Sequence, residues 1–271
     1  MNIEYYHLPA ERLSEGNIPV KLLGDSGEIF YEMALDMIEE IEKNNKLGAQ
    51  TVFIVPVGPV GQYPIFVRLV NERKLSLKNV WFFNMDEYLD DGKNYIDKDD
   101  KLSFRGFMDR TVYSQINPEL VMPERQRIFP DPQDLEKCDK LIEELGGVDI
   151  AFGGIGINGH LAFNEAEDVC EDEFLSRTTR VLHISEETKV ANAIGDLNGA
   201  IDSMPHYAVT IGMKQIFSAR KVRLGVFRDW HRAVIRRALF DEVSGSFPVT
   251  LMQHHKNAMI YVNSNAAKIP F

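Results

Sequence analysis

Short runs of β-forming residues alternate with amphipathic segments along this 271-residue chain, and that alternation limits the folds that the chain can adopt. In residues 25–45, for example, Ile29, Met33, Met37 and Ile41 recur every four residues with acidic residues between them, as in a helix with one buried face. Further helices are expected over 63–74, 104–116, 134–145 and 229–240 and from residue 185 onward, and strands over 51–57, 80–84, 148–152, 207–211, 222–227 and 258–262. The alternation predicts one Rossmann-like α/β domain over residues 1–271, with a mostly parallel central sheet and helices on both faces.

The formal net charge of −11 argues against bulk attraction to nucleic acid or to an anionic membrane, although a locally basic pocket can still bind an anionic small molecule. The two cysteines, Cys138 and Cys170, lack the Cys-x-x-Cys spacing of zinc sites. The first residues lack the basic and apolar regions of a signal peptide, and no apolar run approaches membrane-spanning length. We therefore expect a reduced, cytoplasmic protein.

Three loops lie where an open parallel sheet binds its ligands, at the carboxyl ends of expected strands. They follow Val57, Asn84 and Phe152. The third loop, from Gly153 to Glu165, is rich in glycine, which lets the backbone turn sharply and approach a ligand closely.

In this glycine loop, Gly154, Gly156 and Gly159 also match the spacing of the dinucleotide fingerprint. That fingerprint needs a helix directly after the glycines and an acidic residue at a strand end about 20 positions later, and the sequence shows neither. Walker, zinc and nucleophile-elbow motifs are also missing, and the adjacent His254 and His255 would point to opposite faces of a strand. We expect neither a cofactor nor a metal.

Ionisable residues in two of the loops are candidates for moving protons. Asp86 and Glu87 follow the second expected strand, where a buried carboxylate can act as a general base, whereas an isolated acidic pair also serves as a turn cap. In the glycine loop, His160 lies two residues after Asn158 and five before Glu165. A carboxylate that hydrogen-bonds an imidazole orients it and raises its pKa, so such a histidine can move a proton to or from a ring oxygen of a ligand.

Two separated motifs resemble those of the glucosamine-6-phosphate deaminase/isomerase family, which shares a superfamily with the 6-phosphogluconolactonases. They are Phe83-Asn84-Met85-Asp86-Glu87-Tyr88 and Gly153-Gly154-Ile155-Gly156-Ile157-Asn158-Gly159-His160-Leu161-Ala162-Phe163-Asn164-Glu165. Shorter matches follow in the family's order at 176–178, 188–192 and 207–212. The lactonases share the glycine–histidine loop, but their loop does not continue as Ala-Phe-Asn-Glu.

The resemblance implies a reaction that needs no cofactor. Asp86 matches the general base that moves a proton between C2 and C1 of the open-chain sugar, His160 the residue that opens the pyranose ring, and Glu165 its carboxylate partner. Asn158 stands where the family has aspartate and cannot carry the charge that supports an imidazolium, although we count it with the other three as catalytic. Substrate contacts are expected from Gly58, Val60, Gly61, Glu87, Gly154, Gly156, Gly159, Ile194, Arg228 and His231.

The phosphate-binding elements of the family are all altered in this chain. The Thr-Gly-Gly-Thr-Pro loop of the family corresponds to residues 57–61, its phosphate-binding arginine to Ile194 and its lysine to His231. Burying a phosphate dianion against apolar side chains costs more than it gains. Two alternatives stay open: a relocated anion site, or a substrate without a 6-phosphate. The relocated site would use Arg228, His231, Arg232 and Lys189.

We therefore expect an enzyme of carbohydrate metabolism, an amino-sugar isomerase or deaminase whose partner is a small sugar or sugar phosphate. Two alternatives are a non-catalytic sugar-binding or regulatory protein on the same fold, and a lactone hydrolase that uses His160 as its base and does not need Asp86. Arg180 matches a position that contacts the allosteric ligand in hexameric family members, and the sequence is compatible with a monomer or a homo-oligomer.

Overall fold

The computed structural model describes residues 3–271, and within them seven strands form the main sheet. Their order is β1-β10-β9-β6-β2-β3-β5, and every neighbouring pair is parallel. The predicted α/β class with a mostly parallel central sheet is confirmed. The strands are β1 Val20–Leu23, β2 Thr51–Val55, β3 Val80–Asn84, β5 Arg127–Ile128, β6 Ile150–Gly153, β9 Lys221–Val226 and β10 Ala258–Asn263.

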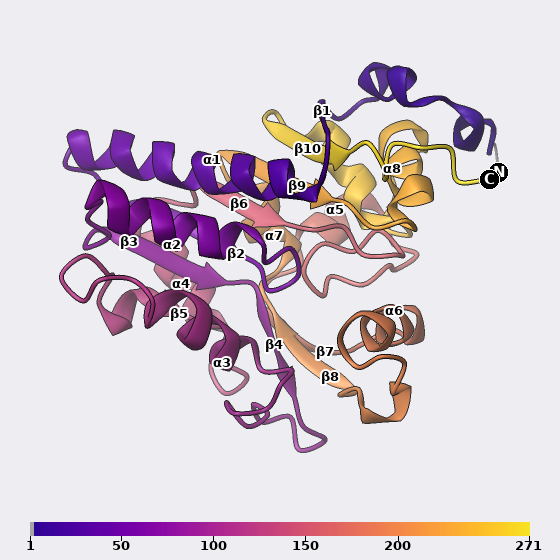
Figure 1. The fold of residues 1–271 in the computed structure, drawn as a ribbon. Coiled ribbons are helices and arrows are strands. Elements are labelled where there is room, and N and C mark those ends of the chain that lie inside the picture. The colour runs from indigo at the N-terminus through magenta and orange to yellow at the C-terminus, as the bar shows by residue number, and fades with distance from the viewer. Residues whose placement is uncertain (1–2) are drawn as a thin grey trace.

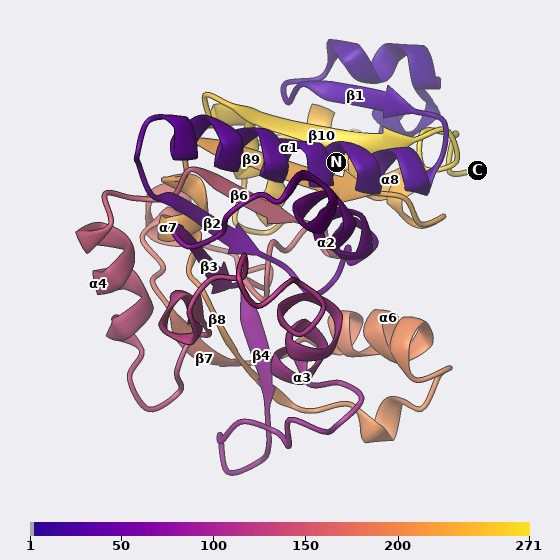
Figure 2. The ribbon, with the colours of Figure 1, turned by 60° about the vertical axis from the view of Figure 1, so that its left-hand side comes forward.

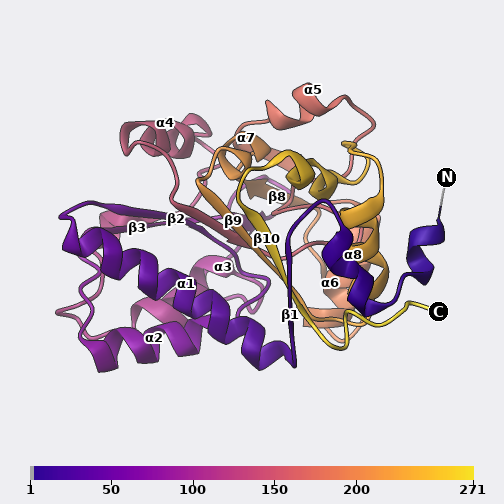
Figure 3. The same ribbon diagram turned by 90° about the horizontal axis from the view of Figure 1, so that it is seen from above.

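Helices cover both faces of the main sheet, as Figure 3 shows from above. On β2, Phe53 and Val55 pack in one apolar cluster with α1 and α2, whereas Val52 and Ile54 pack in the other with α4, α7 and α8. Successive side chains of a strand point to opposite faces, so this almost wholly apolar strand supplies both cores. None of the helices within residues 3–271 is long and apolar enough to span a bilayer. The helices named here are α1 Ser26–Lys46, α2 Gln62–Arg73, α4 Glu136–Glu144, α7 Met213–Phe217 and α8 His231–Phe240.

A second, three-stranded antiparallel sheet in the order β4-β8-β7 lies beyond the carboxyl end of β3. Only Met85 separates β3 from β4, so the chain passes from one sheet into the other without a turn (Figure 1 and Figure 2). The Met85 N–H donates to the Val55 carbonyl, and the Ile211 N–H donates to the Met85 carbonyl. We predicted the strand at β8 but not β4 or β7, because Asp86 and Glu87 lack the apolar alternation of a half-buried strand. The strands are β4 Asp86–Leu89, β7 Arg180–His183 and β8 Tyr207–Thr210.

Helix α6, from Glu186 to Asp196, packs beside the small sheet (Figure 1). It begins where predicted, because the Ser185 hydroxyl accepts a hydrogen bond from the Thr188 N–H. The helix expected over 104–116 is instead α3 Phe104–Met108 followed by one turn of π-helix, η3 Asp109–Tyr113. The remaining short elements are η1 Glu4–His7, η2 Ala10–Glu15, η4 Glu124–Gln126, α5 Glu171–Leu175, η5 Ile201–Ser203 and η6 Pro248–His254.

Arg236 of α8 ties together the two ends of the chain, which lie beside this helix in Figure 1. Its side chain is fully buried and donates to four carbonyl oxygens, those of Leu8, Arg232, Ala267 and Lys268. Because the guanidinium fork satisfies several carbonyls that water does not reach, its removal leaves those acceptors unpaired.

We predict that Arg236→Met lowers the free energy of unfolding by about 2–5 kcal/mol, since several buried acceptors lose their donor at once. Urea unfolding followed by circular dichroism measures the change. The matched control is Arg68→Met on α2, where the arginine is largely exposed and pairs with Glu72, and a change below about 1 kcal/mol is expected. Equal effects of the two substitutions would show that Arg236 does not hold the ends of the chain.

Candidate active site

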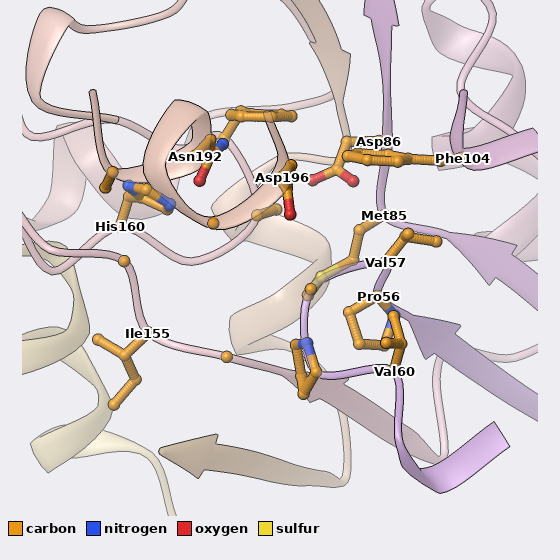
Figure 4. Close-up of a pocket in the computed structure, with 18 of the residues that line it drawn as sticks. Pro56, Val57, Val60, Met85, Asp86, Phe104, Ile155, His160, Asn192 and Asp196 are labelled. Atoms are coloured by element: carbon orange, nitrogen blue, oxygen red, sulfur yellow. The ribbon is translucent and has the colours of Figure 1, made fainter. Parts of the chain in front are cut away.

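A cavity of about 440 Å³ lies where the main sheet and the small sheet diverge (Figure 4). All three loops predicted to bind a ligand contribute to it, together with α6 and the segment after β9. The parallel arrangement brings the carboxyl ends of β2, β3, β6 and β9 to one edge, so loops distant in the sequence meet there. The lining includes Val57, Gly58, Pro59, Val60, Met85, Asp86, Tyr88, Lys101, Phe104, Gly154, Gly156, His160, Asn192, Asp196, Phe227, Arg228 and His231.

Asp86 is the first residue of β4, and its carboxyl group faces the cavity (Figure 4). The residue is only 7% exposed, and no side chain or N–H group within residues 3–271 forms a hydrogen bond or ion pair with the carboxylate. Burial, and then the nearby negative charge of Glu87, raise the pKa of Asp86 well above its usual value. A buried carboxylate without a partner is costly, and it is suited to take a proton from a bound molecule.

Glu87, the next residue, has the opposite surroundings, because neighbouring residues of a strand face opposite sides. It is 0% exposed and does not line the cavity. Its oxygens accept hydrogen bonds from the Ser103 hydroxyl at 3.0 Å, from the Phe104 N–H at 2.9 Å and from the Arg105 N–H at 2.8 Å. Glu87 therefore lies outside the cavity lining, contrary to the expectation of a substrate contact, and its carboxylate joins the segment before α3 to β4.

His160 lies across the cavity from Asp86 and is held by Asn158, which in turn contacts Glu165 (Figure 4 shows His160 and Asp86). Asn158 Nδ2 donates to Glu165 Oε2 at 2.8 Å, which leaves Asn158 Oδ1 facing His160 Nδ1, also at 2.8 Å. Because an amide oxygen only accepts, Nδ1 must carry the proton, and this assignment follows from the hydrogen-bond pattern. In the neutral ring, Nε2 then keeps its lone pair as a proton acceptor.

Burial lowers the pKa of His160, while Glu165 opposes this effect from 3.6 Å. Glu165 Oε2 also accepts hydrogen bonds from the hydroxyls of Ser185 and Thr188, each at 3.0 Å. The first turn of α6 thus fixes the carboxylate that orients Asn158. Asn158 and Glu165 do not line the cavity, so they position His160 and do not touch a ligand themselves.

The glycines of the loop after β6 have different tasks. Gly154 and Gly156 line the cavity, and a Cβ atom on Gly156 would lie 2.0 Å from the His160 ring. Gly159 has a φ of +82° and faces Phe247, and Gly61 faces Phe30, so neither of these lines the cavity as expected. Each of these two glycines packs its loop closely against that aromatic side chain.

At the end where the resemblance implies a phosphate, the residue that corresponds to the phosphate-binding lysine, His231, carries no positive charge. His231 is buried, and its Nδ1 accepts from the N–H groups of Phe227 at 3.0 Å and Arg228 at 2.9 Å. Nε2 therefore carries the proton and lies 3.0 Å from the Ile155 carbonyl. Burial lowers the pKa of His231 to about 3, so the ring is neutral at physiological pH.

The other groups proposed for a relocated anion site point elsewhere. Lys189 contacts Glu186 and His206, and Arg232 contacts Asn265 and Asp229. Neither lines the cavity, whereas Arg228 does and is exposed at its edge. Ile194 is 67% exposed and lies outside the cavity lining, because α6 turns Asn192 and Asp196 toward the cavity instead.

Sequence analysis missed Lys101, Asn192 and Asp196, which all line the cavity. Asn192 and Asp196 lie four residues apart and so share a face of α6. The Ser185 cap together with helical periodicity could have revealed that face. Lys101 comes from a polar loop, and no local pattern placed it here.

Sequence similarity to known proteins identifies the family of this chain. Over 218 residues, the chain is 30% identical to a glucosamine-6-phosphate deaminase of Clostridium botulinum, and the match covers 78% of this chain and 81% of that protein. The chain belongs to the glucosamine-6-phosphate deaminase family. The same enzyme of Clostridium perfringens is 29% identical over 246 residues, which are 87% of this chain and 93% of that protein. The family resemblance found in the motifs is confirmed.

Solved structures agree with membership of the glucosamine-6-phosphate deaminase family. A monomeric glucosamine-6-phosphate deaminase has a TM-score of 0.80 at 25% identity, covering 93% of this chain and 100% of that chain. A 6-phosphogluconolactonase of Trypanosoma cruzi, with a TM-score of 0.65 and 17% identity over 92% of this chain and 96% of that chain, shares the fold. No family model matches the chain.

We predict that Asp86→Asn stabilises the protein. The raised pKa means that folded Asp86 binds its proton more tightly than unfolded Asp86, so ionisation at neutral pH costs stability, and this cost grows as pH rises through the folded pKa. The neutral amide removes the cost, and each kcal/mol gained raises the melting temperature by about 2–4 °C. Scanning calorimetry at pH 7 and at pH 4 measures the effect, which should be smaller at pH 4. A melting temperature that falls at pH 7 would contradict the unpartnered carboxylate.

Proposed function

We propose that this protein is an aldose–ketose isomerase and deaminase of 2-amino sugars, and that its substrate lacks the 6-phosphate. The observation that carries the proposal is the unpartnered carboxylate of Asp86 facing the same cavity as His160. Such a pair can remove a proton from carbon on one side and open a sugar ring on the other.

His160 and Asp86 carry out successive steps of the proposed reaction. His160 Nε2 takes the proton of the C1 hydroxyl and returns one to the ring oxygen, which opens the pyranose to an aldehyde. Asp86 removes the C2 proton while water gives a proton to the C1 oxygen, which yields a C1=C2 enolamine with a hydroxyl on C1. Asp86 then delivers its proton to C1, and the nitrogen on C2 returns a proton to the hydroxide left in solvent. The product is a ketose imine, and water adds at C2 to release ammonia and leave the ketose. Every proton taken is returned or passes to solvent, so no redox partner is needed.

The missing phosphate site supports the second part of the proposal. Val57 and Val60 stand where the resemblance implies hydroxyls, and Pro59 has no N–H to offer. The N–H groups of His231 and Arg232 at the start of α8 already bond the carbonyls of Arg228 and Asp229, so they are not free for an anion. A neutral hydroxymethyl end fits these surroundings better than a dianion.

The buried carboxylate of Asp86 in the cavity favours an isomerase over a lactonase. A lactonase that uses His160 as its base has no need for a second, costly carboxylate in the cavity. The isomerase needs one at carbon, and Asp86 is the buried carboxylate that remains free to act because donors have taken up Glu87.

The test of this function follows two signals, ammonia release and exchange of the C2 proton with deuterated water, for free glucosamine, free galactosamine and their 6-phosphates. We expect both signals with a free amino sugar, and a loss of at least about 100-fold in Asp86→Asn because the base is removed. The matched control is Asp91→Asn, an exposed carboxylate in the loop after β4, which should leave the rate unchanged. Absence of exchange with all four sugars would reject the function, and faster turnover of the phosphates would reject the substrate class.

A second prediction concerns the tautomer of His160. We expect Asn158→Asp to raise the pKa of His160, because a carboxylate beside Nδ1 stabilises the imidazolium that burial disfavours. Nitrogen-15 NMR of the imidazole over a pH titration reports both the pKa and the protonated nitrogen. The neutral wild-type ring should show Nδ1–H, and the control Asn94→Asp, in an exposed loop, should change neither. A neutral ring protonated at Nε2 would contradict the proposed relay.

A further inference from the structure

Glu87 follows Asp86 on β4, and the proposed reaction gives it no part. Its carboxylate is fully buried and, within residues 3–271, accepts hydrogen bonds from five donors. Three of them are the contacts with the 103–105 segment described above, and the others are the Tyr88 N–H at 2.9 Å and Arg105 Nε at 3.1 Å. Two carboxylate oxygens offer about four lone-pair sites, so this side chain is used fully as an acceptor.

The segment that Glu87 holds brings the ring of Phe104 into the cavity wall. Phe104 is the first residue of α3, and its N–H is one of the donors to Glu87. The residue is half-buried and lines the cavity. In the view of Figure 4 its ring lies beside the carboxyl group of Asp86. The bond to Glu87 thus anchors the backbone from which this ring projects.

Two buried aromatic side chains, Tyr88 and Phe163, pack against Phe104. Tyr88 shares one face of β4 with Asp86, because the two residues are two positions apart in a strand. Its ring centroid lies 4.9 Å from that of Phe104. The ring of Phe163 is nearly parallel to that of Phe104, with 6.4 Å between the centroids and 5° between the planes. Phe104 is therefore the member of this aromatic cluster that is open to the cavity on the side of Asp86.

We propose that Glu87 is a positioning residue for the proton transfer at Asp86: by holding the 103–105 segment, it keeps the ring of Phe104 beside the Asp86 carboxyl and so excludes water from it. The inference rests on the proposed function, because it gives Glu87 the task of supporting the base of that reaction. A carboxylate against an apolar wall binds a proton more tightly than a hydrated one and is the stronger base.

Glu87 also acts on Asp86 directly through its charge. Burial is the larger cause of the raised pKa of Asp86, and the charge of Glu87 is the second. The phenols of Tyr63 and Tyr88 are also near Asp86. The other ionisable side chains in the cavity lining are those of Lys101, His160, Asp196, Arg228 and His231. A test must separate the placement of Phe104 from the charge of Glu87.

Glu87→Asp makes that separation, because it keeps the charge but shortens the side chain by one methylene, so that the carboxylate no longer reaches the 103–105 segment. Carbon-13 NMR of the aspartate carboxyl groups measures the pKa of Asp86, whose signal is assigned by its loss in Asp86→Asn. We expect Glu87→Asp and Phe104→Ala each to lower this pKa by about 1 unit, because water reaches the carboxylate. Phe104→Leu, which keeps the apolar bulk, should lower it by less than about half as much.

The two substitutions should not add. Phe104→Ala in the Glu87→Asp background should lower the pKa of Asp86 by less than about 0.3 unit further, since the ring has already left its place. In the active protein, kcat/KM rises with pH as Asp86 loses its proton, so this limb should move to lower pH by the same shift in both single variants. The rate above the limb should fall by about 3- to 10-fold, because a weaker base removes a carbon-bound proton more slowly.

Asp149→Asn is the matched control, since Asp149 is a buried carboxylate that anchors the chain outside the cavity lining. It accepts from the Val52 N–H at 2.8 Å and from Arg220 Nη1 at 2.7 Å. Both Asp149→Asn and Glu87→Asp should lower the melting temperature, because each leaves buried donors unpaired. Only Glu87→Asp should change the pKa of Asp86 and move the limb of the pH profile.

An unchanged pKa of Asp86 in Phe104→Ala would show that the ring does not exclude water. An unchanged or raised pKa in Glu87→Asp would show that Glu87 acts through its charge alone. Either result, or additive shifts in the double variant, would overturn the inference. The NMR titration needs no turnover. If the expected shifts appear without exchange of the C2 proton or release of ammonia, the proposed reaction fails while the support of Asp86 by Glu87 stands.

Discussion

The cavity of this protein depends on the point at which one extended stretch of chain leaves the main sheet. β3 pairs in parallel with β2 and β5, whereas β4, which begins one residue later, pairs antiparallel with β8. Since Met85 shares backbone hydrogen bonds with both Val55 and Ile211, the two sheets are joined at this residue and diverge beyond it. The space between them receives the loops at the carboxyl ends of β2, β6 and β9, and α6 closes it from the side of the small sheet.

Strand β4 places two adjacent carboxylates, Asp86 and Glu87, in opposite surroundings. Asp86 and Glu87 differ by one position, and the pleat directs one into the cavity and the other into a ring of donors. Glu87 is stabilised by its partners and stiffens the cavity wall, whereas Asp86 is left buried without any. The strand therefore holds a buried carboxylate without a partner on a well-bonded support, and the proposed function uses that carboxylate as the base.

On the His160 side of the cavity, a chain of hydrogen bonds through charged and neutral groups orients the imidazole. Ser185 and Thr188 at the start of α6 fix Glu165, Glu165 fixes the amide of Asn158, and the amide oxygen fixes the protonated nitrogen of His160. An asparagine thus orients the imidazole as an aspartate would, without bringing a charge to it. The sequence shows only that Asn158 lacks the charge of an aspartate, whereas the hydrogen-bond geometry gives it the separate role of selecting a tautomer.

Much of the architecture could be inferred before any coordinates. Helical and strand periodicity located α1, α2, β2, β3 and most of the later elements, because apolar spacing reflects which face is buried. Strands β1, β4, β5 and β7 and the face of α6 that carries Asp196 were not predicted, because these short segments show no clear apolar alternation. Substrate contacts were also predicted for Glu87 and Ile194. Whether these side chains face the cavity depends on which side of the strand or helix carries them, and the local sequence pattern does not show that side.

The amino-acid pattern alone therefore specifies the order of the elements, the α/β class and the residue types available for proton transfer. Local spacing carries that information because burial on one face repeats with the period of a helix or a strand. The folded chain decides which carboxylate stays free and which histidine nitrogen is protonated. Those properties arise from contacts between segments more than twenty residues apart, such as Thr188 with Glu165 and β4 with β8, and no local pattern encodes them.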